Sequence, residues 1–75
     1  MEEEKIHGFE IDAGEHHQAL DFIKKHMNER QVEDMVHIAK TGHGASFMVT
    51  HDGVKIGDYK LVLEGDKLRI HHEHN

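Results

Sequence analysis

Histidine is the residue type that offers this chain the most chemistry, because ten of its 75 residues are histidine. Imidazole is the side chain that most often binds metals, and its unperturbed pKa of about 6.5 brings its charge change close to neutrality. The first chemistries to weigh are therefore metal binding and a response to mild acid. The ten positions are His7, His16, His17, His26, His37, His43, His51, His71, His72 and His74.

The densest histidine cluster lies near the end of the sequence, where residues 71–74 read His-His-Glu-His. Alternate residues of a β-strand point to the same side, so His72 and His74 would share one face. Two imidazoles at this spacing predict a weak site for zinc, nickel or copper, with at most one further ligand. The strand expected opposite would supply Tyr59 and Lys60, which are poor zinc ligands. The alternative interpretation is a polar chain end that binds no metal.

A second histidine pair, His16 and His17, falls at the start of a predicted helix. His17 and Asp21 are spaced to share a metal on one helix face, but no HExxH motif supports such a site. His16 lies near the apolar stripe, and a cation is unfavourable at a helix N-terminus. We therefore expect stability or association to change between about pH 7 and pH 5, with His16 as the main candidate.

Catalytic motifs are missing from the sequence. Ser46 is the only serine, it falls inside a predicted strand, and no GxSxG elbow surrounds it. The chain has no cysteine, which excludes thiolate zinc sites and internal disulfides. Asp52, Asp58 and Asp66 each adjoin a glycine, and turn formation accounts for them. We therefore expect a protein that is not an enzyme.

The charge balance disfavours two kinds of partner. The formal net charge is −6 with histidine neutral, and the nine lysines and arginines are scattered. An acidic chain gains little from phosphates or anionic lipids, so we expect neither nucleic acid nor membrane as a partner. Apolar runs are only a few residues long, and the first five residues, Met-Glu-Glu-Glu-Lys, lack the charge of a secretory signal. These features favour a cytoplasmic protein.

The apolar pattern predicts one small domain, residues 1–75, that begins with a strand and a helix. A short strand is expected at 5–11. Residues 12–15 have the spacing of a capping box, with Asp12 as N-cap and Glu15 bonding back. The helix that follows should reach about 28–31, since apolar residues there recur at helical spacing.

Residues 32–41 fit two patterns. Val32, Met35, Val36 and Ala39 recur at helical spacing, whereas Val36 and Ile38 also alternate as in a strand. In a single uninterrupted helix from residue 13, the apolar residues of 32–41 would lie on a different side of the helix from those before residue 28. We favour a strand from about Met35, paired with the next strand across a four-residue loop, and keep the helix as the alternative.

The remaining residues predict an antiparallel meander. A strand at 45–51 is followed by an Asp-Gly turn, across which Val49 would oppose Ile56. A bulge or second turn at 57–58 would restore the phase of the apolar residues. A tight turn at 64–67 would then bring Leu63 opposite Leu68, and Leu61 opposite Ile70.

The expected fold is α+β: an N-terminal strand, one main helix on one sheet face, then an antiparallel β-meander of three to four strands. Met35, Met48 and Val62 would lie on the sheet face that this helix leaves uncovered. We therefore expect a small non-enzymatic binding or regulatory domain that contacts a protein partner through these three residues and self-associates, as a homodimer. The alternative is a histidine-rich metal-binding protein; apart from a weak zinc site at His72 and His74, no cofactor is expected.

Overall fold

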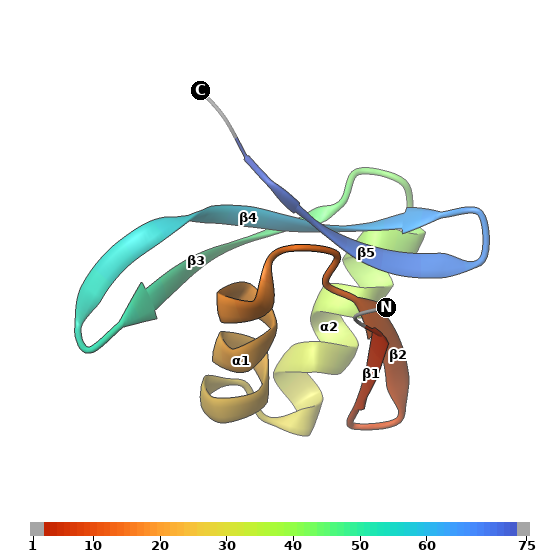
Figure 1. Cartoon of the computed structure of the whole chain (residues 1–75). Helices are drawn as coiled ribbons and strands as arrows, with labels where there is room; N and C mark the ends of the chain where they lie inside the picture. Colours follow the sequence, from red (N-terminus) through yellow and green to blue (C-terminus); the bar gives the residue numbers. More distant parts are fainter. Residues whose placement is uncertain (1–2, 74–75) are drawn as a thin grey trace.

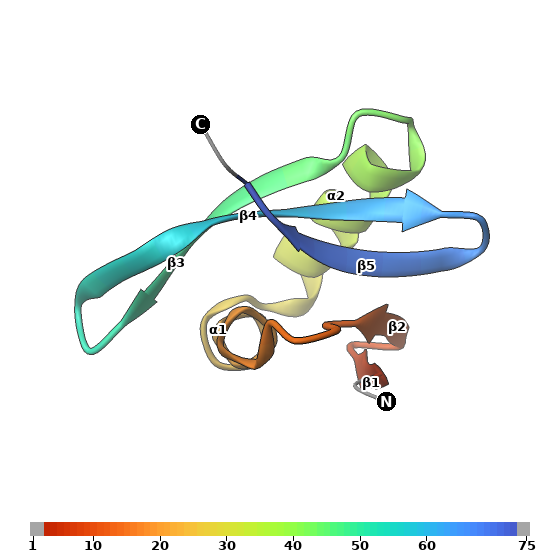
Figure 2. The ribbon, with the colours of Figure 1, turned by 45° about the horizontal axis from the view of Figure 1, so that its top comes forward.

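The computed structural model describes residues 3–73 as two short strands, two helices and three longer strands (Figure 1). The elements are β1 Glu3–Ile6, β2 Phe9–Asp12, α1 His17–His26, α2 Glu29–Lys40, β3 Ala45–His51, β4 Val54–Glu64 and β5 Lys67–His72. Both helices lie on the same side of the sheet that β3, β4 and β5 form (Figures 1 and 2). The α+β class and a layer of helix on one sheet face are therefore confirmed, with two helices where one was expected and a hairpin, β1 and β2, where a single strand at 5–11 was expected.

The sheet contains five strands in the order β1-β2-β5-β4-β3. Three of the four neighbouring pairs are antiparallel, but β2 runs parallel to β5 through two residue pairs, Ile11 with Leu68 and Asp12 with Arg69. The sheet is thus mixed, and the purely antiparallel meander covers only its β3–β5 part. The β1–β2 hairpin adds to the edge of β5, which places β1 and β3 at the two ends of the sheet.

Residues 32–40 lie in α2 and Thr41 is its C-cap, so the favoured strand prediction is wrong and its helical alternative is right. The apolar residues at helical spacing, from Val32 to Ala39, are buried against the sheet, while Ile38 is 47% exposed. The capping signal lies just upstream. Asn28 Oδ1 accepts from the Gln31 backbone N–H over 2.9 Å, and Gln31 Oε1 accepts from the Asn28 N–H over 2.9 Å. This capping box starts a new helix, which lets the apolar stripe change direction between α1 and α2.

The capping box expected at residues 12–15 does not form. Asp12 Oδ1 instead accepts from the Gly14 backbone N–H over 2.9 Å, and Gly14 adopts a φ of +60°. This is a local turn of the kind that aspartate favours. Helix α1 therefore begins later, at His17, and its N-cap residue His16 makes no capping bond through its side chain. It ends at His26, before the expected range, because Met27 is extended.

The core lies between the helices and the sheet, with Ile11, Ile23, Val32, Val49 and Leu61 fully buried. These residues come from β2, both helices, β3 and β4, so one core unites the helices and the sheet. Burial of such side chains is the main source of stability in a small domain. Within residues 3–73, neither helix has the length and apolar character needed to cross a membrane.

The register between β4 and β5 matches the prediction. Leu61 stands opposite Ile70, and Leu63 stands opposite Leu68. The β3–β4 register differs, because Val49 pairs with Gly57 and not with Ile56. No β3 residue stands opposite Ile56, so the bulge that restores the apolar phase lies one residue before the expected 57–58. β4 continues through this point, and a second turn is not needed.

Candidate functional site

Strand β3 is the longer of the two strands that end the sheet, and its outer edge is unpaired within residues 3–73. Its first six residues, Ala-Ser-Phe-Met-Val-Thr, carry no charge. The strand at the opposite end, β1, has only four residues and includes Glu4 and Lys5. Exposed edges present free N–H and C=O groups, and proteins usually protect them with charges or by keeping them short. β1 has both protections, whereas β3 is left open.

Two exposed apolar side chains flank this open edge on opposite sides of the sheet. Met48, in the middle of β3, is 52% exposed and lies on the face away from the helices. Ile38, on α2, is 47% exposed and lies on the helix side. Scattered apolar side chains are ordinary on a surface, but these two lie beside the same unpaired strand, so its margin carries an apolar side chain on each side of the sheet.

On the helix side, the margin deepens into a groove of about 330 Å³ between α2 and β3. Its apolar walls come from Met27, Ile38, Phe47 and the inner face of α2, and polar atoms of Gln31 and Asp34 lie at the same groove. This combination of an open strand edge and an apolar groove beside it suits an extended chain that pairs with β3 and lays alternate side chains into the groove.

Of the three residues predicted for an interface, only Met48 is well exposed. Met35 is 5% exposed, because the helical conformation of α2 turns it toward the core, so its expected place on the second sheet face was wrong. Val62 lies on β4 and is half-buried. A β-carbon added at Gly44 would come within 3.0 Å of Val62 Cγ1, which shows how closely the chain before β3 packs against Val62.

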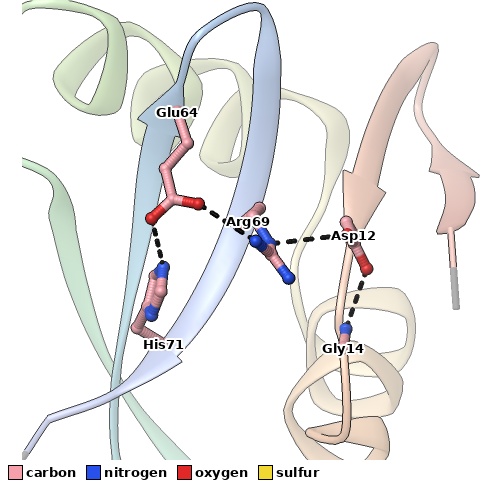
Figure 3. Close-up of polar contacts among 5 residues, drawn as sticks. All are labelled: Asp12, Gly14, Glu64, Arg69 and His71. Atoms are coloured by element: carbon pink, nitrogen blue, oxygen red, sulfur yellow. Dashed lines mark hydrogen bonds and ion pairs between the residues drawn. The ribbon is translucent and has the colours of Figure 1, made fainter.

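On the outer face of β4 and β5, polar contacts join Glu64, Arg69 and His71 (Figure 3). His71 Nε2 donates to Glu64 Oε2 over 2.8 Å, and Arg69 Nη1 donates to Glu64 Oε1 over 3.2 Å. The hydrogen bond from His71, with that from Arg69, holds the pKa of Glu64 below its usual range. Arg69 Nε also lies 3.4 Å from Asp12 Oδ2. This network links β4, β5 and β2, and it makes the β4–β5 surface a poor site for apolar association.

Of the predicted metal pair, only His72 lies within the described residues. His72 packs its ring against Tyr59, with the ring centroids 4.9 Å apart, and Tyr59 is also its partner across the strands, as predicted. The ring of His16 completes this aromatic cluster at 5.3 Å from Tyr59 and 6.2 Å from His72. His74 lies outside the described residues. Within residues 3–73, no three histidine or carboxylate side chains gather to hold a metal ion.

A hollow of about 450 Å³ is lined by residues of α1 and of the β3–β4 hairpin, and this hairpin curves past α1 (Figure 1). Phe22 and Ile56 provide its apolar surface, and ionisable side chains of both signs share its lining. Among them, His51 Nε2 and Asp52 Oδ2 are 3.4 Å apart, and both side chains are largely exposed.

Ser46, the only serine, is exposed on β3. It shares a smaller hollow of about 270 Å³ with Phe47, Met48, Asp58 and Glu73. Two carboxylates, Asp58 and Glu73, line this hollow, and Lys60 is the register partner of Ser46 on β4.

No protein-family model matches the chain, and neither a curated protein nor a solved structure matches it. The functional assignment therefore follows from the residues and their geometry. Sequence reasoning found Met48 but missed Ile38 and the groove, because the groove exists only when residues 29–40 form a helix. The signal that could have found it was the Asn-Glu-Arg-Gln sequence at 28–31, which has the spacing of a capping box.

Proposed function

We propose that this chain is a small non-enzymatic binding domain that contacts other protein chains through the open edge of β3. The observation that carries the proposal is the seven-residue end strand, uncharged from Ala45 to Thr50, beside the groove that α2 forms. A bound segment would run extended along β3. Hydrogen bonds between main chains would supply the general affinity, and the groove would select the side chains that point inward.

Selection by the groove follows from the alternation of side chains in a strand. Every second residue of the bound segment would point to the helix side, where Met27, Ile38 and Phe47 offer apolar contact. The residues between them would point to the outer face beside Met48. Asp34, at the same groove, would favour a segment with a basic or neutral side chain at that end.

The edge is preorganised for such binding, because β3 is already held in an extended conformation. It pairs with β4 along its whole length, and both helices contact it from below. On binding, the partner strand would therefore lose conformational entropy as it becomes ordered, whereas β3 would lose little.

The proposal is tested by selecting binders from a library of random extended peptides. Selected peptides should slow amide hydrogen exchange in β3, and binding should fall at least tenfold in Ile38→Lys, which places a charge in the groove. The matched control is Val54→Lys, since Val54 is an apolar residue 65% exposed at the hairpin tip and lies outside the groove. Peptides that protect a different segment, or that bind Ile38→Lys as well as the native chain, would contradict the proposal.

A further inference from the structure

We infer that the strand which pairs with β3 is the β3 of a second copy of this chain, related to the first by a two-fold axis at Met48. This inference rests on the proposed function, since it names the partner for the same open edge. Met48 is the central residue of Ala45–His51. An antiparallel pair centred there would join two five-stranded sheets into one continuous sheet, with all four helices on one side.

Charge permits this partner at this edge. In the two-fold pairing, Phe47 stands opposite the partner's Val49, and Ser46 stands opposite the partner's Thr50. All of these side chains are neutral. Two copies of a chain with a formal charge of −6 repel each other in general. The stretch from Ala45 to Thr50 is where they can approach without opposing two like charges directly across strands.

The same rotation also covers both exposed apolar residues that flank the edge. On the outer face, Met48 would meet the partner's Met48. On the helix side, the side chains of β3 that point toward the helices, among them Phe47, would extend toward the partner's groove. Ile38 would face the partner's β3 strand. Among the described residues, four large apolar side chains are notably exposed, and one symmetry operation buries two of them. A peptide unrelated to this chain would need apolar side chains of its own at the matching positions.

The other end of the sheet explains why the assembly should stop at two copies. β1 carries Glu4 and Lys5, and Glu4 Oε1 already accepts from Lys24 Nζ over 2.8 Å. Its four residues offer a short, charged edge that opposes further pairing. A contact between two β3 strands is self-complementary and closes on itself, so it yields a dimer and not a filament.

The size of the contact sets the expected affinity. One seven-residue strand with Ile38 and Met48 buries less than the roughly 800 Å² per partner of a standard stable interface. We therefore expect a dimer that dissociates in the micromolar range and that tightens with added salt, because salt screens the negative charge of the two copies.

The axis is tested by cysteine cross-linking, which is clean here because the chain has no cysteine. Under mild oxidation, Met48→Cys should form a disulfide-linked dimer, since residues facing each other across antiparallel strands lie close to disulfide distance. The matched control is Val62→Cys, on the same face but one strand inward. We expect Met48→Cys to cross-link at least tenfold faster. Equal rates would overturn the edge arrangement in favour of contact between sheet faces.

A charge-reversal pair provides a second, independent test. Met48→Lys and Met48→Glu should each be monomeric in sedimentation at tens of micromolar, because each places like charges at the axis. Their equimolar mixture should dimerise, which happens only if Met48 faces the partner's Met48. A mixture that stays monomeric overturns the inference. If the native chain is monomeric but selected peptides still bind β3, the self-pairing is wrong and the proposed function stands; if neither occurs, both are wrong.

Discussion

Arg69 Nε lies 3.4 Å from Asp12 Oδ2, and this ion pair spans the only parallel pairing described in the sheet (Figure 3). Asp12 and Arg69 are also register partners, and just one further residue pair joins β2 to β5. The Asp12 side chain is largely shielded, whereas the Arg69 side chain is more exposed and reaches Glu64 with Nη1. Arg69 thus ties the β1–β2 hairpin to the main sheet at the point where backbone pairing is shortest.

We expect Arg69→Ala to loosen the β1–β2 hairpin more than it lowers global stability. The ion pairs it removes are partly exposed, so the free energy of unfolding should fall by only about 0.5–1 kcal/mol. Amide hydrogen exchange should speed up in β1 and β2 while β3 and β4 stay protected. Lys67→Ala, on the same strand, is the comparison. Uniform acceleration through all five strands would show that Arg69 does not act locally.

Glu64 should make stability sensitive to acid below its ordinary titration range. Its pKa is lowered in the folded chain, first by the hydrogen bond from His71 and then by Arg69. The stabilising contribution is therefore complete above the unfolded pKa, and it is lost as the pH falls through the folded value. Melting temperatures from pH 6 to pH 3 should differ most between the native chain and Glu64→Gln at pH 6, and the curves should converge in acid. Parallel curves would exclude this role; Glu33→Gln on α2 serves as the control.

The parts of the fold that could be predicted are those specified by neighbouring residues. The 64–67 turn and the alternating apolar residues on either side set the β4–β5 register, so Leu61 and Ile70 were paired correctly. The parallel contact of Ile11 with Leu68 could not be read in this way. It joins residues far apart in the sequence, and no turn between them fixes their register.

The candidate site was harder to predict because it depends on the order of the strands. Met48 could be identified as exposed from its place in the alternation, but nothing local shows that β3 ends the sheet. Ile38 was assigned to a strand because residues 32–41 fit both apolar periods. The deciding feature is the N-cap at Asn28. In the sequence, the residues around Asn28 could equally lie inside one longer helix. Only the change in direction of the apolar stripe indicates that one helix ends and a second begins there.

The break between α1 and α2 can be tested at that cap. Asn28→Ala removes the acceptor for the Gln31 N–H, and we expect the free energy of unfolding to fall by about 1 kcal/mol. Asn28→Ser keeps a side-chain oxygen and should recover most of this loss. Urea denaturation of the three proteins provides the comparison. If Asn28→Ser is as unstable as Asn28→Ala, the side-chain hydrogen bond is not what stabilises the start of α2.

The response to mild acid expected from the sequence stays a prediction, and the structure indicates where to test it. The His16 and His72 rings both pack on Tyr59, with their own centroids 6.2 Å apart. Two positive charges placed on these neighbouring rings would repel each other. We expect His16→Gln to reduce the fall in melting temperature between pH 7 and pH 5, with exposed His43→Gln as the control. Identical pH profiles for the native chain and His16→Gln would exclude this cluster as the source.

Weak zinc binding through His72 and His74 also stays a prediction, and it can be separated from the packing role of His72. His72→Phe keeps a ring against Tyr59 but removes the imidazole nitrogens, so combining it with His74→Ala removes both ligands at little cost to the fold. In equilibrium dialysis, this double variant should bind zinc at least tenfold more weakly than the native chain. His17→Ala combined with His43→Ala is the matched control and should bind normally. If the control loses zinc and the first pair keeps it, the ligands lie elsewhere; if the native chain takes up no stoichiometric zinc, the prediction is wrong.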